Sequence, residues 1–417
     1  MTGEGETRRR GDKETGRQGD GETRRGGDKE TERKGERETG SGGGVMSHRI
    51  AVLFEYPTLN GGERSMLQML GAADTSELDV VAIAPAAGRL AAELRRRSIE
   101  HVSLELRDRQ GKRLPRPVVC EQLVETIKFV APALVHANSL AMSRLTGAIS
   151  HRTVCCVGHL RDIIGLSRAA IDDLNRNRLL IAVSAATRRF HVEQGLDPNR
   201  TRVIYNGVDC RRFQPRPMTG MLCRELDLPK SSFVILTIGQ IGLRKGQDVL
   251  AEAASAVVAR VPEAHFVVVG ERNSAKPESV EFERNLVIRF QLAGLRDRLH
   301  CLGYREDVEL LLNEADLLVH PAKQEPLGRV LMEAAAAGLP VVATDVGGTS
   351  EMITDGVSAR LVSAGAPAAL ADAIVELADD EAKRHGFATA ARRRMVRDFG
   401  AESAATRLCA AWHQLLQ

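Results

Sequence analysis

Residues 325–333 read E-P-L-G-R-V-L-M-E, and their flanks predict the fold of the surrounding chain. Upstream, residues 315–321 (A-D-L-L-V-H-P) have the apolar run of a buried strand that ends at a proline. Downstream, residues 334–340 (A-A-A-A-G-L-P) have the pattern of a helix end, a glycine stop and the entry to a strand at 341–344. The stretch therefore predicts a strand, a helix and a second strand, which is the repeating unit of a parallel α/β sheet.

The predicted helix opens at the carboxyl end of a strand. Pro326 suits a first helical turn, so the free N–H groups of Leu327, Gly328 and Arg329 are expected to point at whatever lies above the helix. The helix dipole favours an anion at this position. Gly328 would let that anion approach the backbone closely.

Two carboxylates, Glu325 and Glu333, flank the first turns of this helix. Glu333 could accept hydrogen bonds from hydroxyl groups of a ligand whose phosphates sit on the helix end, and a sugar nucleotide has that layout. The spacing alone carries no information, because Glu306 and Glu314 are also eight apart. Two solvated helix carboxylates are the alternative, but the strand, proline, glycine and helix context favours a binding site.

Composition limits the possible classes of protein. A chain of 417 residues with 43% apolar content can form two domains with cores. Only 3% aromatic residues and a net charge of +3 argue against a nucleic-acid partner. Seven cysteines without zinc or redox spacing fit a reducing cytosol. No apolar run approaches a membrane span and no signal-peptide core is evident, so the expected location is cytoplasmic.

Residues 1–45 form a separate, strongly charged segment. The sequence of residues 5–15 recurs almost unchanged at residues 21–31. Apolar side chains are nearly absent, so this segment cannot offset its ordering entropy and is predicted to be disordered. It is either a charged interaction tail or a translated repeat upstream of a start at Met46.

From residue 49 onward, short apolar strands alternate with helical stretches, which predicts parallel sheets. The first series of strands is expected at residues 50–54, 80–84, 133–136, 154–157, 180–183 and 202–204. The second series is expected at residues 234–238, 266–269, 300–302, 317–320, 341–343 and 359–362. The predicted domains are residues 46–215, a linker at 216–232, residues 233–398, and a final helix at 399–417 that packs back on the first domain. Two doubly wound domains predict a ligand in the cleft between them.

Glycine-rich loops follow the first strand of each predicted domain. Gly61 and Gly62 open a helix and would allow backbone amides to approach a phosphate or sugar, with a plain turn as the alternative. They do not form G-x-G-x-x-G, which argues against an oxidoreductase of the dinucleotide-binding kind. In the second domain, Gly239 begins a loop that carries Arg244 and Lys245. These cations could neutralise a diphosphate leaving group, or form an exposed basic turn.

Two histidines end neighbouring strands, His136 in L-V-H-A-N-S and His159 in V-G-H-L-R-D-I. A histidine at this position faces the cleft, where it can donate to a sugar hydroxyl or share a proton. We assign His159 to function and His136 to packing. Residues 347–348 begin another amide-rich loop, or a turn before a helix with Thr349 or Ser350 as its cap.

Residues 325–333 resemble the E-x7-E motif of the retaining GT-B glycosyltransferases of the large family four. The resemblance covers about residues 48–416 and includes the loops at 60–64, 204–209, 239–246 and 347–351. It implies an α/β GT-B fold, in which two Rossmann-like doubly wound parallel-sheet domains face a central cleft.

The resemblance also implies roles for particular residues. Glu325 would lie against the donor sugar, His159 near the reacting sugar and Lys245 at the diphosphate, as the catalytic residues. The implied donor-binding residues are Gly61, Gly62, Gly239, Arg244, Leu327, Gly328, Arg329, Val330 and Glu333, the last of these binding the ribose. Gln240 stands where the family usually has arginine, so a second cation on the diphosphate depends on Arg244.

The implied function is transfer of a sugar, with retained configuration, from a UDP- or GDP-sugar to a hydroxyl of a glycan, lipid-linked or small-molecule acceptor, as in polysaccharide biosynthesis. No cofactor and no metal are expected. A non-catalytic sugar-nucleotide-binding protein and a sugar-nucleotide epimerase of the same fold are the alternatives. The arginine-rich stretch at 95–116 predicts peripheral contact with an anionic membrane, against the alternative of a solvated surface.

Overall fold

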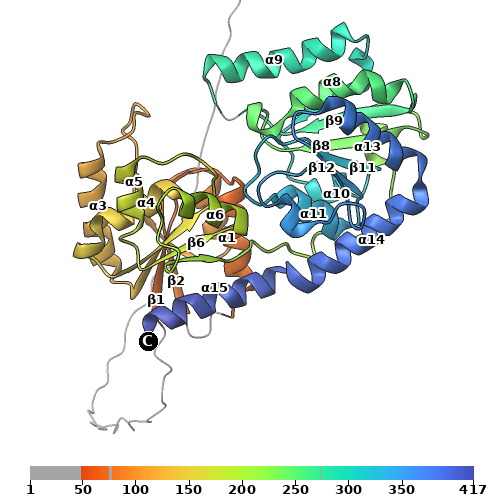
Figure 1. The fold of residues 1–417 in the computed structure, drawn as a ribbon. Helices are drawn as coiled ribbons and strands as arrows, with labels where there is room; N and C mark the ends of the chain where they lie inside the picture. Colours follow the sequence, from red (N-terminus) through yellow and green to blue (C-terminus); the bar gives the residue numbers. More distant parts are fainter. Residues whose placement is uncertain (1–47, 75–77, 273) are drawn as a thin grey trace, which may run out of the picture. The chain divides into compact units, whose positions relative to one another are not determined.

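The computed structural model describes residues 48–74, 78–272 and 274–417 (Figure 1). The charged tail at residues 1–45 and the expected start at Met46 lie outside these ranges. The described chain contains two parallel sheets with helices between their strands, so the predicted α/β class with two doubly wound sheets is confirmed.

The first sheet has seven strands in the order β3-β2-β1-β4-β5-β6-β7, all paired in parallel. They are β1 (His48–Leu53), β2 (Leu78–Ala84), β3 (Glu100–Ser103), β4 (Leu134–Ala137), β5 (Cys155–Leu160), β6 (Leu179–Ala182) and β7 (Thr201–Val203). The prediction missed β3. This strand lies at the sheet edge, and three of its four residues (E-H-V-S) are polar, which removes the continuous apolar signal of a buried strand.

The second sheet has six strands in the order β10-β9-β8-β11-β12-β13. They are β8 (Phe233–Ile238), β9 (Ala264–Val269), β10 (Leu299–Gly303), β11 (Leu317–His320), β12 (Val341–Thr344) and β13 (Arg360–Val362), all of them predicted. In both sheets the first strand of the series lies at the point where the strand order reverses. Ligands of doubly wound folds bind outside the carboxyl ends of the strands at this point.

Helices connect the strands of both sheets. Those of the first domain are α1 (Gly61–Ala72), α2 (Arg89–Arg96), α3 (Arg116–Val130), α4 (Leu140–Ile149), α5 (Arg168–Leu174) and α6 (Ala185–Glu193). Those that follow are α7 (Met221–Glu225), α8 (Gln247–Val258), α9 (Pro277–Leu292), α10 (Val308–Leu311), α11 (Arg329–Ala337), α12 (Thr349–Met352), α13 (Pro367–Asp379), α14 (Glu381–Asp398) and α15 (Ala401–Leu416). Helix α7 interrupts the segment predicted as an irregular linker, because Leu222 is buried in the core of the second sheet.

Both faces of each sheet are covered. In β1, Ile50 and Val52 pack into one core while Ala51 and Leu53 pack into another on the opposite face. A parallel strand that is buried on both faces reads as a continuous apolar run, which explains why the sequence revealed it.

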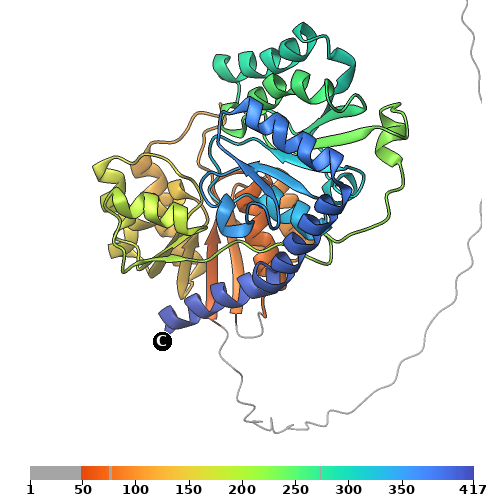
Figure 2. The same ribbon diagram turned by 45° about the vertical axis from the view of Figure 1, so that its right-hand side comes forward.

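The last two helices contact different domains. Helix α14 contacts α11, whereas α15 contacts α1 (Figure 1). Figure 2 shows α15 in dark blue beside the strands of the first sheet. Leu408 and Trp412 of α15 are buried in the core that also contains Ile50 and Val52.

Gly207, where the chain after β7 packs against the start of α15, is expected to be sensitive to substitution. Replacing Gly207 with Ala should lower the free energy of unfolding by about 1–3 kcal/mol. The new Cβ would lie 2.5 Å from the Cα of Ala401 and would displace the start of α15. That start is fixed by a backbone hydrogen bond of 2.8 Å from Val208 N–H to the Phe399 carbonyl. Urea unfolding measures the change.

Gly386 of α14 provides the matched control. A Cβ there would meet no atom within 4 Å, and the residue lies inside a helix. Gly386→Ala should therefore leave stability unchanged or raise it by up to about 1 kcal/mol. Equal effects of the two substitutions would contradict the proposed packing at Gly207.

Candidate functional site

Loops from both domains meet where the strands of the two sheets end. The loop after β5 contains Asp162 and Ile163, and both contact the second domain. The Asp162 carboxylate lies 3.4 Å from Arg244 Nη1, and the Ile163 carbonyl accepts a hydrogen bond of 2.5 Å from Gln324 Nε2. The cleft predicted between the domains is thus bordered by the loops after β5, β8 and β11.

Glu325 lies at the centre of this region. Its side chain is almost fully buried, and Oε2 lies 2.5 Å from Lys245 Nζ and 2.8 Å from His320 Nε2. Burial raises the pKa of Glu325, but the Lys245 ammonium and the His320 contact outweigh it and hold the pKa well below its usual range. Glu325 is therefore an ionised carboxylate inside the protein.

The sequence analysis did not assign His320 to the site. It is the last residue of β11, immediately before Pro321. The strand-end argument that selected His136 and His159 applies equally to His320 and would have found it. Burial lowers the pKa of His320, so the ring is neutral and donates Nε2–H to Glu325.

The start of the acidic helix differs from the prediction. Helix α11 begins at Arg329 with Gly328 at the N-cap, so Pro326 lies before the helix and not in its first turn. The cause is tertiary contact, because the Pro326 carbonyl accepts a hydrogen bond of 2.6 Å from Ser184 Oγ. Gly328 has φ +103°, a left-handed conformation that favours glycine. Leu327 is buried, and the first free N–H groups of the helix are those after Gly328, including Val330.

Glu333 is also buried, on the second turn of α11. Its Oε1 accepts a hydrogen bond of 2.6 Å from Arg329 Nε, four residues earlier. Among the described residues, Arg329 Nη1 has no hydrogen-bond partner although the atom is buried. The Glu333 carboxylate is therefore paired at the start of α11, whereas the Nη1 group of Arg329 has no hydrogen-bond partner among the described residues.

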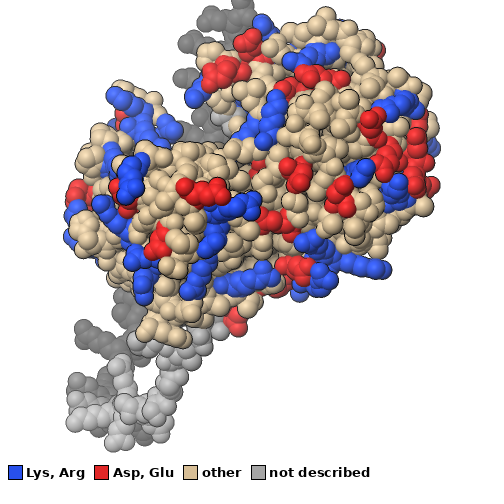
Figure 3. All heavy atoms as spheres, in the orientation of Figure 1, with Lys and Arg blue, Asp and Glu red and all other residues tan. Residues whose placement is uncertain are grey.

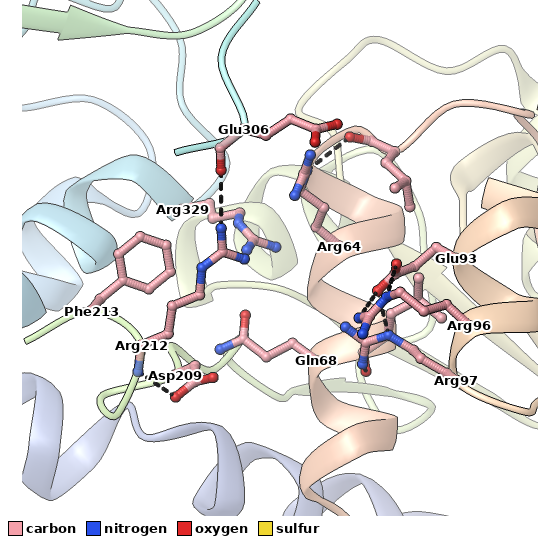
Figure 4. Close-up of a pocket in the computed structure, with 12 residues that line it drawn as sticks. Arg64, Gln68, Glu93, Arg96, Arg97, Asp209, Arg212, Phe213, Glu306 and Arg329 are labelled. Carbon is pink, nitrogen blue, oxygen red and sulfur yellow. Dashed lines mark hydrogen bonds and ion pairs between the residues drawn. The ribbon is translucent and has the colours of Figure 1, made fainter. Parts of the chain in front are cut away.

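Arg329 lines a cavity of about 230 Å³ that is bordered by residues of both domains (Figure 4). Its cationic lining residues are Arg64, Arg96, Arg97, Arg212 and Arg329. In Figure 4, Arg212 and Arg329 lie close together on one side, and Arg64 and Gln68 approach from α1. The carboxylates in the lining are fewer, namely Glu93, Asp209 and Glu306. This lining suits a ligand that carries negative charge.

The glycine loop of the first domain opens α1 as predicted. Glu63 caps the helix by accepting from the Asn60 backbone N–H at 3.1 Å, and burial raises the pKa of its carboxyl. Gly62 passes close to Arg161, because a Cβ there would lie 3.2 Å from Arg161 Cδ. No atom lies within 4 Å of a Cβ built on Gly61. Gly62 therefore has a structural reason to be glycine, namely the close packing of Arg161. The contact of this loop with the donor stays a prediction.

Arg161 is a second residue that the sequence analysis missed. Its guanidinium donates to Asn138 Oδ1 at 2.7 Å and to Asn206 Oδ1 at 2.9 Å, and Nη2 lies 3.2 Å from His159 Nδ1. Burial lowers the pKa of Arg161 to about 10, which still leaves it charged at neutral pH. Its position two residues after a strand-end histidine was the available signal.

The two cations of the predicted basic loop contact different carboxylates. Lys245, in the short 3₁₀ turn Leu243–Lys245, reaches Glu325. Arg244 is partly exposed and reaches Asp162 of the other domain instead. Gly239 lies next to the stem of Lys245, since a Cβ there would be 3.7 Å from Lys245 Cε. The loop thus directs one cation to the buried carboxylate and one across the cleft.

The loop after β12 lies directly behind Glu325. A Cβ on Gly347 would lie 1.8 Å from the Glu325 carbonyl, and Gly348 N–H donates to the same carbonyl at 3.1 Å. Gly348 is the N-cap of α12, and its cap has no side-chain hydrogen bond, so the predicted caps Thr349 and Ser350 were wrong. The loop supports the backbone of the acidic segment.

Glu351, on α12, caps a helix of the other domain. Its carboxylate accepts hydrogen bonds of 2.7 Å from both Ala185 N–H and Ala186 N–H at the start of α6. Tyr205 Oη donates to it at 2.9 Å. A carboxylate at a helix N-terminus is favoured by the dipole, so this contact stabilises the approach of the two domains.

The cysteines do not form a reactive centre. All seven are free, and Cys155 and Cys156 lie in β5 as predicted. Burial raises the pKa of the Cys156 thiol to about 11, which disfavours the nucleophilic thiolate. Within the described ranges, no group of three or more His, Cys, Asp or Glu side chains is placed to hold a metal ion.

Several arginines of the basic stretch at 95–116 are engaged in ion pairs. Arg96 and Arg97 contact Glu93, and Arg116 contacts Asp173. Figure 3 shows Lys and Arg side chains interspersed with Asp and Glu on the face in view. None of the described helices is both long and apolar enough to span a bilayer. Membrane contact therefore stays a prediction.

Two family models match the chain over adjacent ranges. The model described as Glycosyltransferase Family 4 matches residues 59–212, and the model described as Glycosyl transferases group 1 matches residues 223–394. The first range covers the first sheet except β1, and the second range covers the whole second sheet. Together they include Glu325, Lys245 and His159. The chain belongs to glycosyltransferase family 4.

Curated glycosyltransferases and a related synthase are similar to this chain over part of their length. The D-inositol 3-phosphate glycosyltransferase of Salinispora tropica is 35% identical over 47% of this chain and 42% of its own. The lipopolysaccharide core mannosyltransferase LpsB of Rhizobium meliloti is 28% identical over 63% of this chain and 80% of its own. The α-maltose-1-phosphate synthase of Mycobacterium tuberculosis is 32% identical over 53% and 59%. Apart from LpsB, the chain spans about half the length of these relatives.

Solved structures establish the GT-B fold of this family 4 chain. Anabaena HepE in complex with UDP and glucose superposes with a TM-score of 0.78 at 24% identity, over 88% of this chain and 99% of HepE. The sucrose-phosphate synthase of Thermosynechococcus elongatus gives a TM-score of 0.74 at 19% identity, over 88% and 99%. The expected architecture is therefore confirmed.

The buried Glu325 carboxylate predicts a pH-dependent stability. Replacing Glu325 with Gln should lower the free energy of unfolding at neutral pH by about 1–3 kcal/mol, because Lys245 loses its charge partner. The pKa of Glu325 is depressed in the folded protein, so its stabilising effect is fully present above the unfolded pKa of about 4.3 and is lost as the pH falls toward the folded pKa. The difference between the two proteins should shrink in acid.

Urea unfolding at a series of pH values measures this difference. Glu281→Gln is the matched control, because Glu281 is an exposed glutamate on α9. The control should show no pH-dependent difference from the wild type. A Glu325→Gln difference that does not change between neutral and acidic pH would contradict an ionised, paired Glu325.

Proposed function

We propose that the chain transfers a sugar from a nucleotide diphosphate sugar to a hydroxyl group, with retention of anomeric configuration and without a metal ion. One observation carries this proposal. A buried, ionised Glu325 is paired with Lys245 beside the N-terminus of α11, at the switch point of the second sheet. This arrangement combines a buried negative charge, a partly exposed cation and a helix dipole in one site.

The cations of the site can stabilise the diphosphate as it leaves. When the bond between the anomeric carbon and the diphosphate oxygen breaks, negative charge develops on that oxygen. Lys245 and the first N–H groups of α11 are positioned to stabilise the charge, and Lys245 retains enough exposure to meet a ligand. Arg244 is the candidate second cation, once it leaves Asp162.

Glu325 can stabilise the positive charge that develops on the sugar. An ionised carboxylate in a water-poor site stabilises such a charge far more than it would in water. His320 and Lys245 keep Glu325 ionised before the substrate arrives, so no reorganisation is required during the reaction. The acceptor oxygen forms the new bond on the face that the diphosphate leaves, and the departing oxygen is the nearest base for its proton.

The relatives support this donor class. HepE was solved with UDP-glucose, and similar proteins include a mannosyltransferase and an enzyme that uses UDP-Gal on a diphosphoundecaprenol acceptor. Their acceptors include both lipid-linked and soluble hydroxyl compounds. We therefore propose a UDP- or GDP-sugar donor and a glycan, lipid-linked or small-molecule acceptor.

Incubation with a panel of UDP- and GDP-sugars, with acceptors and excess EDTA, tests the proposed function. Transfer predicts acceptor-dependent release of free nucleotide diphosphate and an α-product from an α-donor. Binding without turnover would support a non-catalytic binding protein, and epimer formation would support an epimerase. A requirement for a divalent ion would contradict the assignment of the leaving-group charge to Lys245 and α11.

Glu333 should affect donor affinity. We propose that its Oε2 accepts hydrogen bonds from the ribose hydroxyls while Oε1 remains with Arg329. Glu333→Ala should weaken donor binding by about 1.5–3 kcal/mol, the range for hydrogen bonds to a charged group. Isothermal titration calorimetry with the nucleotide diphosphate measures the effect.

Arg329→Ala separates the two interactions of this pair. It leaves the Glu333 carboxylate in place and removes its internal partner. Glu333→Ala should weaken binding more than Arg329→Ala does. Unchanged affinity in Glu333→Ala would show that the ribose binds elsewhere.

A further inference from the structure

Three buried rings connect the C-terminal helix to the predicted site. Trp412 Nε1 of α15 donates a hydrogen bond of 3.0 Å to His136 Nδ1 at the end of β4. His136 Nε2 lies 3.1 Å from His159 Nδ1 at the end of β5. All three side chains are fully buried, and Trp412 is the single tryptophan of the chain.

The chemistry of the flanking groups fixes the direction of these hydrogen bonds. The Trp412 indole N–H can only donate, so His136 Nδ1 must accept. The Arg161 guanidinium can also only donate, and its Nη2 lies 3.2 Å from His159 Nδ1, so this nitrogen must accept as well. A neutral histidine whose Nδ1 accepts carries its proton on Nε2. His136 Nε2–H therefore donates to His159, and His159 carries its own proton on Nε2.

Both rings are neutral. Burial and the Arg161 charge lower the pKa of His136 to about 3. Burial, Arg161 and His136 hold the pKa of His159 well below its usual range. A protonated His159 would also need a proton on Nδ1, where two N–H groups already point. The environment thus opposes an imidazolium on both electrostatic and geometric grounds.

The remaining nitrogen of His159 has no partner. His159 Nε2 is buried and makes no hydrogen bond to any described residue. An unsatisfied N–H in the interior costs about 1–3 kcal/mol and is rare in native proteins. The loop that follows His159 contacts Arg244 and Gln324 of the second domain, so the ring lies on the strand end that faces the cleft.

We propose that Arg161 holds His159 in the Nε2–H tautomer and that Trp412 and His136 are positioning residues that fix the orientation of its ring. His159 then donates a hydrogen bond to a ligand oxygen and does not act as a general base. The identity of that oxygen as one of the donor sugar rests on the proposed function. The proposal gives His136 a role beyond the packing expected from the sequence. For His159 it selects donation to a hydroxyl over proton sharing, the two alternatives that the sequence left open. It also gives the C-terminal helix a part in the site.

Nitrogen NMR of ¹⁵N-histidine-labelled protein tests the tautomers directly at neutral pH. His136→Gln and His159→Gln variants assign the two rings by loss of their signals. We expect both rings to be neutral, with the proton on Nε2. A wild-type His159 that carries its proton on Nδ1, or is an imidazolium, would overturn the inference. This readout needs no substrate, so it is independent of whether the proposed transfer occurs.

Trp412→Phe tests the coupling, since it keeps an aromatic ring and removes the N–H donor. We expect the His136 and His159 signals to shift, because His136 Nδ1 loses its donor. We also expect kcat/KM for sugar transfer to fall about fivefold to tenfold, the effect of one net hydrogen bond. Leu408→Val is the matched control, because Leu408 is buried on the same helix and has no polar atom in its side chain. It should leave the tautomers and turnover unchanged.

The variants separate positioning from packing. If Trp412→Phe fails to fold, His136→Gln tests the same connection from the other side and should also lower kcat/KM. Unchanged histidine signals in Trp412→Phe, or an equal loss of turnover in Leu408→Val, would overturn the positioning role. Correct tautomers in a protein that transfers no sugar would contradict the proposed function and leave the tautomer assignment intact.

Discussion

The ion pair between Glu325 and Lys245 is the interaction on which the arrangement of the second domain depends. A carboxylate with almost no solvent exposure requires a cation and a hydrogen-bond donor, and Lys245 and His320 supply them. Lys245 comes from the loop after β8, and His320 is the last residue of the neighbouring strand β11. The loop after β12 approaches so closely behind Glu325 that only glycine fits at position 347. The same contacts that keep Glu325 ionised therefore determine the shape of the site.

Contacts across the cleft extend this constraint to the first domain. The segment between Glu325 and the start of α11 is held by Ser184, and Glu351 caps the helix that Ser184 begins. Gln324 and Arg244 reach the loop after β5. The segment that follows Glu325 and the loop after β5 are thus linked by one set of contacts, whose members are distant in sequence. Proteins that bind a charged ligand at a domain interface commonly have such polar linkage.

Structural features that depend on the local pattern of residues could be predicted from the sequence. Continuous apolar runs revealed twelve of the thirteen strands in the described part of the chain, and the edge strand β3 was missed because three of its four residues are polar. The setting of Glu325 and Lys245 could be predicted from strand, glycine and helix signals. Their direct contact could not, because it joins residues eighty apart. Arg161, and the connection from Trp412 to His136, depend on contacts between separate elements, which a single sequence does not contain. The start of α11 was misplaced for the same reason, since a hydrogen bond from Ser184 holds Pro326 outside the helix.

The central claim is that Lys245 stabilises negative charge on the leaving diphosphate. The most direct measurement is the single-turnover rate of Lys245→Ala, together with its affinity for the intact nucleotide sugar. A group that stabilises charge which develops only as the bond breaks raises the reaction rate more than it raises the affinity for the intact substrate. The account predicts a fall of about a hundredfold or more in the rate, with a much smaller change in donor affinity. A loss confined to donor affinity, with an unchanged rate at saturation, would contradict it.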